Sequence, residues 1–250
     1  MTTDLPNRAN RSRYALVGAV SVGLILALVL SIFALDSKGR GSRIINTACG
    51  LVEQCANVLL VANAPEAYRA LKRSGLYGRK LLHVGRYLHF IEPDLKAVFE
   101  GRMAFPVRTD SILNLAEARL SQENFIWMAM EAGISRSVDY LLPSEDYKQR
   151  LAQVQGVVGI EASERSIVTH HWGSRRALYH EVPVYKEPVL LHVDASYFLA
   201  REPEYLVDEL VQSGIRTDMV LLNLANDNPV VGDAERERLL RAYSMIGQGR

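Results

Sequence analysis

Short apolar runs alternate with amphipathic stretches over most of the chain. The apolar runs have the length of β-strands, and in the stretches between them apolar residues recur at helical spacing. Strands are predicted at 57–62, 80–90, 137–142, 156–160, 166–169, 189–198 and 218–224, and helices at 65–74, 121–132, 144–154, 203–212 and 233–246. Because these strands are apolar on both faces and alternate with helices, the pattern predicts βαβ units. The expected fold is α/β, a three-layer α/β/α domain with a mostly parallel sheet over residues 57–250.

Residues at the ends of two predicted helices support their limits. Pro65 stands at a first helical position and Gly75 follows the last turn, which is the usual asymmetry of helix ends. Ser121 is expected to cap the helix at 121–132, and Gly133 is expected to end it.

One apolar run is much longer than a strand and precedes the domain. Residues 14–35 carry no charge over 22 positions, and about 20 helical residues span the hydrocarbon core of a bilayer. A cleaved secretory signal normally has an apolar region of only about 7–15 residues, and Ile32-Phe33-Ala34 is a poor cleavage site. We therefore expect an uncleaved transmembrane helix at 14–35, after an N-terminal tail (1–13) and before a polar juxtamembrane linker (36–56).

The charges that flank this span give little information on its orientation. Three basic residues lie on each side: Arg8, Arg11 and Arg13 before it, and Lys38, Arg40 and Arg43 after it. The positive-inside count is therefore a tie. The free amino terminus adds positive charge before the span and so favours a cytoplasmic tail. This predicts a single-pass protein whose domain lies on the non-cytoplasmic side.

Composition excludes some classes of partner and metal site. The chain is 48% hydrophobic and 23% charged with a formal net charge of +1, so it lacks the basic excess of nucleic-acid-binding proteins and no nucleic acid partner is expected. The two cysteines, Cys49 and Cys55, have no zinc-site spacing and are too few for a disulfide framework. They are expected to be buried thiols, with one disulfide as the alternative in an oxidising compartment.

Candidate chemistry lies at the ends of two predicted strands. His83 and His89 flank one end, and His192 and Asp194 flank the other. Ligands of parallel sheets bind beyond the carboxyl ends of the strands. Both pairs are separated by an even number of positions, so along an extended strand each pair faces one side of the sheet. The alternative interpretation of His83 and His192 is that they are buried strand histidines hydrogen-bonded to their neighbours.

These segments resemble a known family in their order and spacing. The stretches 81–93, 119–143 and 190–198 are similar to the HIDSHPDL-type strand end, the LSIENWI-type segment and the DLDFF-type strand end of a little-characterised, hydrolase-like branch of the arginase and deacetylase superfamily. The resemblance implies a sheet whose strand ends hold two divalent metals through carboxylates and a histidine. Such metals, zinc or manganese, polarise and activate a water molecule for hydrolysis.

The chain departs from this pattern at most of the implied ligand positions. Gly85, Tyr87 and Ser196 replace ligands, His89 replaces an aspartate, and only Asp194 keeps the ligand type. A histidine that the resemblance implies near position 64 is also absent. Two metals carry about four positive charges, which one carboxylate cannot compensate. We therefore expect no binuclear centre and no resident cofactor, with an ion pair between Arg86 and Asp194 as a hypothesis for what replaces the metal charge.

The expected function is that of a membrane-anchored, non-catalytic binding or assembly module, a pseudoenzyme that uses the former active-site cleft to bind an unknown protein partner. The first alternative is a divergent amide or C–N hydrolase in which Asp194 and His89 are catalytic and hold one divalent metal such as zinc or manganese. A type II anchored glycosyltransferase is the second alternative, although the segment 194–196 lacks a second aspartate. Arg175 and Arg176 are expected on a solvated surface, with anion binding as their alternative role.

Overall fold

A computed structural model describes residues 49–50, 57–89, 117, 120–171, 174–199 and 201–247. The chain divides into two compact units, Met1–Ser42 and Arg43–Arg250, and all the described residues belong to the second. The expected tail, the anchor at 14–35 and Cys55 lie outside them. In the described ranges no helix has both the length and the apolar character needed to span a membrane.

The described strands form one nine-stranded sheet in the order β1-β9-β8-β3-β4-β7-β6-β5, with β2 also paired to β9. Strands β2, β9, β8, β3, β4 and β7 run parallel, whereas β1, β6 and β5 join antiparallel. Their bounds are β1 Cys49–Gly50, β2 Val58–Val61, β3 Arg79–Val84, β4 Ser135–Leu141, β5 Glu161–Ala162, β6 Ile167–His171, β7 Ser174–Tyr179, β8 Val189–Asp194 and β9 Arg216–Asn223. The predicted α/β class with a mostly parallel sheet is confirmed, and Cys49–Gly50, within the expected linker, belong to the sheet.

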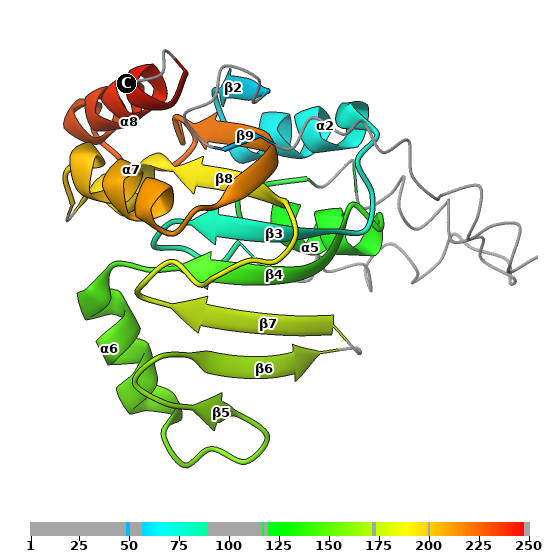
Figure 1. The fold of residues 1–250 in the computed structure, drawn as a ribbon, viewed down its shortest axis with the longest axis vertical. Helices are drawn as coiled ribbons and strands as arrows, with labels where there is room; N and C mark the ends of the chain where they lie inside the picture. Colours follow the sequence, from blue (N-terminus) through cyan, green and yellow to red (C-terminus); the bar gives the residue numbers. More distant parts are fainter. Residues whose placement is uncertain are drawn as a thin grey trace, which may run out of the picture. The chain divides into compact units, whose positions relative to one another are not determined.

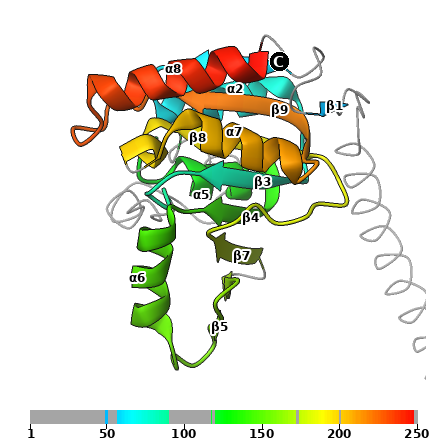
Figure 2. The same cartoon turned by 60° about the vertical axis from the view of Figure 1, so that its left-hand side comes forward.

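Helices cover both faces of this sheet (Figures 1 and 2). Their bounds are α2 Ala64–Ser74, α5 Phe125–Glu131, α6 Ser144–Val154, α7 Pro203–Gln212 and α8 Asp233–Gly247, with a 3-10 helix, η1, at Ala195–Leu199. Helices α2 and α5 enclose one hydrophobic core with the sheet, and α7 and α8 enclose a second core on the opposite face. We call these the α2/α5 face and the α7/α8 face.

The ends of α2 follow from its sequence. The side chain of Asn63 accepts a hydrogen bond from the backbone N–H of Glu66 (3.0 Å), and the Glu66 carboxylate accepts one from the N–H of Ala62 (2.8 Å). These two bonds satisfy backbone donors that a helix start otherwise leaves unpaired. Gly75 ends the helix with φ = 68°, a conformation that glycine adopts without steric cost.

Several predicted limits are wrong, and the errors cluster where a strand leaves the sheet. Strand β3 ends at Val84 and not at residue 90, and β8 ends at Asp194, after which residues 195–199 turn into η1. No strand forms at 156–160, where Gly156 and Gly159 both have positive φ. Helix α5 begins at Phe125, after a turn, and not at a Ser121 cap. An apolar run alone does not show where hydrogen bonding to the next strand stops.

Candidate functional site

The candidate site begins with two histidines that lie side by side in the sheet. His83 of β3 and His192 of β8 are register partners near the carboxyl ends of these parallel strands. Leu81 and Leu190 of the α2/α5 core lie two positions earlier in the same strands, so both histidine rings face the same side, where both are fully buried. The expectation that they are buried strand histidines is confirmed.

Hydrogen bonding fixes the protonation of both rings. His83 Nε2 lies 2.9 Å from the carbonyl oxygen of Tyr87, which only accepts, so His83 Nε2 carries the proton. The two Nδ1 atoms of His83 and His192 are 2.8 Å apart. Since His83 has donated its proton elsewhere, its Nδ1 accepts and His192 Nδ1–H donates. The remaining nitrogen, His192 Nε2, is therefore unprotonated and carries a lone pair. It is buried without a hydrogen-bond partner.

Phe125 at the start of α5 excludes water from these rings. Its ring centroid lies 4.9 Å from that of His192, 5.3 Å from that of His89 and 6.2 Å from that of His83. Burial lowers the pKa of His83 well below its ordinary value and lowers the pKa of His192 to about 4. All three imidazoles are neutral near pH 7, because burial also lowers the pKa of His89.

His89 reaches the site by a route that the sequence does not predict. The strand has already ended at Val84, so the argument from an even offset along an extended strand is wrong. The chain returns through a loop in which His89 has φ = 46°, a left-handed conformation uncommon outside glycine and several-fold enriched for histidine. Its ring hydrogen-bonds the backbone of Gln122, and its Nε2 is buried without a hydrogen-bond partner. We infer that His89 Nδ1–H donates to the backbone of Gln122 and that His89 Nε2 is unprotonated and carries a second lone pair.

Asp194, at the end of β8, is fully buried beside these nitrogens. Its Oδ1 accepts the backbone N–H of Ser196 at 2.9 Å, and its Oδ2 accepts the side-chain amide of Asn223 at 2.8 Å. His89 Nε2 lies 3.9 Å from Oδ2, but the neutral ring forms no ion pair with the carboxylate. The structure thus brings together both sequence-predicted site residues, Asp194 and His89. The structure adds Asn223 to the site. The sequence could have indicated this residue by its position at the end of the predicted strand 218–224.

The positions that the resemblance assigns to metal ligands are occupied by other contacts. A Cβ on Gly85 would lie 2.7 Å from His83 Nε2 and 3.2 Å from Asp194 Cβ, so the space of a side chain there is already filled. The hydroxyl of Ser196 accepts the backbone N–H of Arg86 at 3.3 Å. Over the described ranges no three His, Cys, Asp or Glu side chains are placed to hold one metal ion.

The expected ion pair between Arg86 and Asp194 is wrong. The Arg86 guanidinium instead binds Asp146 of α6 through two bonds, Nε to Oδ2 at 2.7 Å and Nη2 to Oδ1 at 2.8 Å. This bidentate pair fastens the loop after β3 to α6. Asp194 is left without a lysine or arginine partner among the described residues, although it is the more deeply buried carboxylate.

A cleft of about 480 Å³ opens beside His89. Its lining comes from the loop after β3, the turn before α5, helix α6, strand β7 and the loop after β9. The lining residues are Tyr87, Leu88, His89, Gln122, Glu123, Arg150, Arg176, Asn228 and Val230. Arg176 is therefore not on a solvated surface as expected. Arg175 is 36% exposed, so the expectation of a solvated surface holds for it in part, although it binds Asp139 on the opposite face.

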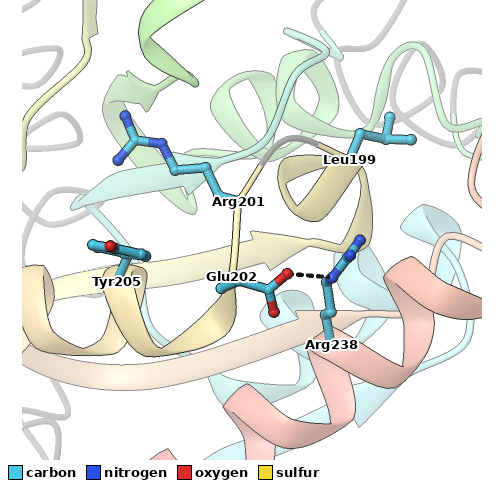
Figure 3. Close-up of a pocket in the computed structure, with 5 residues that line it drawn as sticks. All are labelled: Leu199, Arg201, Glu202, Tyr205 and Arg238. Carbon is cyan, nitrogen blue, oxygen red and sulfur yellow. Dashed lines mark ion pairs between the residues drawn. The ribbon is translucent and has the colours of Figure 1, made fainter.

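A second hollow, of about 530 Å³, lies where the chain enters α7 beside α8 (Figure 3). Its lining residues are Leu199, Arg201, Glu202, Tyr205 and Arg238. Arg238 pairs with Glu202 at 3.1 Å and donates to the carbonyl of Phe198 at 3.0 Å, and Arg201 donates to the hydroxyl of Ser144. The charges of this hollow are therefore engaged by the protein itself, unlike the acceptors beside Asp194.

Comparison of the sequence with models of known protein families and with curated proteins finds no match. The resemblance to arginase and deacetylase-like hydrolases therefore stays a prediction.

Proposed function

We propose that the chain is a membrane-anchored, non-catalytic binding module, held by residues 14–35, with an arginase and deacetylase-like domain on the non-cytoplasmic side. Its ligand or protein partner would occupy the cleft at the carboxyl ends of the parallel strands. In this proposal the residues at the positions of a former hydrolase site now form hydrogen bonds and packing contacts within the domain.

The observation that carries the proposal is the state of Asp194. Both its oxygens accept hydrogen bonds from the domain itself, and the neighbouring ligand position is Gly85, where the His83 ring leaves no room for a side chain. A hydrolytic metal site needs three or more protein ligands around an open position. Hydrogen bonds from Asn223 and Ser196 stabilise this single carboxylate. Two divalent metals would require several carboxylates to balance their positive charge.

A second candidate function is favoured by a specific distance. His89 Nε2 and Asp194 Oδ2 are 3.9 Å apart, whereas two ligands of one tetrahedral zinc ion lie roughly 3.4 Å apart at ordinary bond lengths. A small movement would allow both to bind one zinc or manganese ion, and the lone pair of His192 Nε2 lies on the same sheet face. This arrangement would suit a one-metal amide or C–N hydrolase, with Asp194 and His89 as ligands and a metal-bound water as nucleophile.

Metal content separates the two functions. Full-length protein, purified in detergent without chelator, is expected to hold far less than one equivalent of zinc or manganese, and chelator is expected to leave its melting temperature unchanged. Asp194→Ala is compared with Asp146→Ala, which removes a carboxylate at the same end of the sheet. One equivalent of metal that is lost in Asp194→Ala and kept in Asp146→Ala, together with metal-dependent amide hydrolysis, would establish the hydrolase instead.

A further inference from the structure

The parallel strands begin at one edge of the sheet and end at the other, and the exposed charges of the two edges differ. Strands β8, β3, β4 and β7 point the same way (Figure 1). At the carboxyl edge, beside the cleft, four helices begin with exposed carboxylates in their first turns: Glu66, Glu145, Glu204 and Asp233. Two exposed cations of this edge, Lys148 and Arg241, are paired with its carboxylates.

The loops at the opposite edge, where the strands begin, are joined to one another. The backbone N–H of Arg79 donates to the carbonyl of Ile134 at 3.2 Å, and the Arg79 guanidinium binds Asp218 at 2.8 Å. The Arg136 guanidinium binds Glu187 in the loop before β8. These contacts connect four loops, which we call the amino rim: 75–79, 132–136, 183–188 and 213–218.

Exposed positive charge exceeds exposed negative charge at the amino rim and the helix ends beside it. The exposed carboxylates described there are Glu131 and Glu187, and the exposed cations are Arg73, Arg136, Lys186 and Arg216. Arg73 and Lys186 form no ion pair or hydrogen bond with another residue that the structure describes. These two charges are therefore available to an anionic partner.

Apolar and aromatic side chains project between these charges. Tyr77, in the turn before β3, is 44% exposed, and Val184, in the loop before β8, is 85% exposed. Tyrosine is enriched where proteins meet the headgroup layer of a membrane, because its ring is apolar and its hydroxyl is polar. Clustered lysine and arginine near a membrane bind anionic lipids. The composition of the amino rim thus fits a lipid surface.

The chain enters the domain at this same rim. Cys49 and Gly50 of β1 pair with Thr217 and Arg216. Residues 36–48 separate this strand from the predicted span at 14–35. Thirteen residues reach at most about 45 Å at full extension, and a coil of that length averages about 20 Å from end to end. An anchor at 14–35 therefore holds the amino rim near the bilayer.

We propose that the amino rim docks on anionic phospholipid headgroups of the membrane that holds the anchor, through Arg73, Lys186 and Tyr77. This inference rests on the anchor of the proposed function and adds a lipid-binding surface to it. The cleft lies at the carboxyl edge, so docking by the amino rim turns the cleft away from the bilayer. A partner in solution then reaches it without displacing the domain from the membrane.

Quenching of tryptophan fluorescence by brominated lipid tests the proposal on full-length protein reconstituted into vesicles. The vesicles contain phosphatidylcholine and phosphatidylglycerol in a three-to-one ratio, with bromine near the top of the acyl chains. Tyr77→Trp places a reporter on the amino rim, and Tyr205→Trp, at a tyrosine 69% exposed at the carboxyl edge, is the matched control. The emission of the unsubstituted protein, which contains Trp127 and Trp172, is subtracted. The Tyr77→Trp reporter is expected to lose half or more of its emission, and the Tyr205→Trp reporter almost none.

Removal of charge tests whether anionic headgroups are responsible. In the Tyr77→Trp protein, Arg73→Gln together with Lys186→Gln should lower the ratio of docked to free domain roughly 25-fold, about fivefold for each charge, and abolish most of the quenching. Vesicles of phosphatidylcholine alone should have the same effect. Lys148→Gln together with Arg241→Gln, which removes two charges from the carboxyl edge, should leave the quenching unchanged.

Different results would overturn different parts of this account. Equal quenching of both reporters, no quenching at position 77, or quenching that persists in the double variant and in phosphatidylcholine would refute docking by the amino rim, and the anchor would still stand. Release of the full-length protein from the vesicles by alkaline carbonate would refute the anchor, and with it both the proposed function and the docking.

Discussion

Two buried aspartates lie on opposite faces of the sheet, and the domain treats them differently. Asp139 of β4, on the α7/α8 face, is 1% exposed and binds Arg175 Nη1 at 2.8 Å, Lys80 Nζ at 3.4 Å and the Tyr185 hydroxyl at 3.1 Å. Asp194, on the α2/α5 face, is 0% exposed and is held by a backbone N–H and an amide. One carboxylate is compensated by two cations, and the other is solvated by neutral dipoles.

This difference separates a structural carboxylate from a candidate binding group. The contacts of Asp139 join β3, β4 and β7 to the segment before β8, and the Lys80 ammonium also lies 5.4 Å from the centre of the Tyr185 ring. Its charge is fully used within the fold. Asp194 has no lysine or arginine partner among the described residues, and 3.9 Å from it lies the unpartnered Nε2 of His89, a residue that lines the cleft. Burying a carboxylate without a counter-charge is costly, so Asp194 is the candidate for binding and Asp139 is not.

The comparison predicts unequal costs for the same isosteric change. Asp139→Asn leaves Lys80 and Arg175 without a counter-charge, and should lower the free energy of unfolding by about 3 kcal/mol, at the lower end for broken buried pairs because both cations are partly exposed. Asp194→Asn removes a charge that has no cationic partner, at the cost of one weakened hydrogen bond, so its effect should stay within about 1 kcal/mol. Chemical denaturation of both variants measures the two costs side by side. Equal costs would mean that Asp194 is as fully compensated as Asp139.

The sequence predicts the fold class because the relevant signal is local. Strands such as 137–142 are apolar on both faces, and Pro65 and Gly75 mark the ends of a helix by their own backbone preferences. It also predicts that Asp194 and His89 lie near one another, since the carboxyl ends of parallel strands meet at one edge of a sheet.

The remaining features depend on partners far away in the chain. Strand β7 contains two arginines and lacks the pattern of an apolar strand; it pairs with β4, and its Arg175 binds Asp139, 36 positions earlier. Arg86 finds Asp146, 60 positions later, so its pairing with Asp194 was a reasonable but wrong prediction. The loop that returns His89 to the site requires a positive φ at a residue for which the sequence gives no such indication.

Acid should destabilise the site of Asp194 through its histidines. In the unfolded chain the pKa of His192 is near 6.5, and burial lowers it to about 4 in the folded domain. Between these values the unfolded state binds more protons, so stability is full above pH 6.5 and is lost as pH falls toward 4. His192 alone should contribute about 3 kcal/mol to this loss, and the pKa values of His83 and His89 are lowered in the same direction.

Denaturant unfolding at several values between pH 7 and pH 4 measures the slope of the free energy of unfolding against pH. His192→Asn should flatten it, whereas His170→Asn, at an exposed histidine of β6, should not. Asp139→Asn should keep the slope between pH 7 and pH 5, because the Asp139 network contains no histidine. A slope that is insensitive to His192 would show that the buried pair does not titrate differently in the folded and unfolded chains.

A further prediction tests whether the His83 ring has closed the neighbouring ligand position. Gly85→Ala would place a Cβ 2.7 Å from His83 Nε2. That ring cannot move aside without loss of its hydrogen bonds to Tyr87 and His192, so the variant should lose about 2 kcal/mol of stability, as overpacked cores do. Gly232→Ala is the matched control, because the nearest neighbour of its Cβ is the far end of a longer side chain, the Glu235 carboxylate, at 3.0 Å. In a double-mutant cycle Gly85→Ala should cost under about 0.5 kcal/mol once His83→Ala has emptied the space. An unchanged cost in that background would mean that another contact, and not the His83 ring, excludes a ligand side chain beside Asp194.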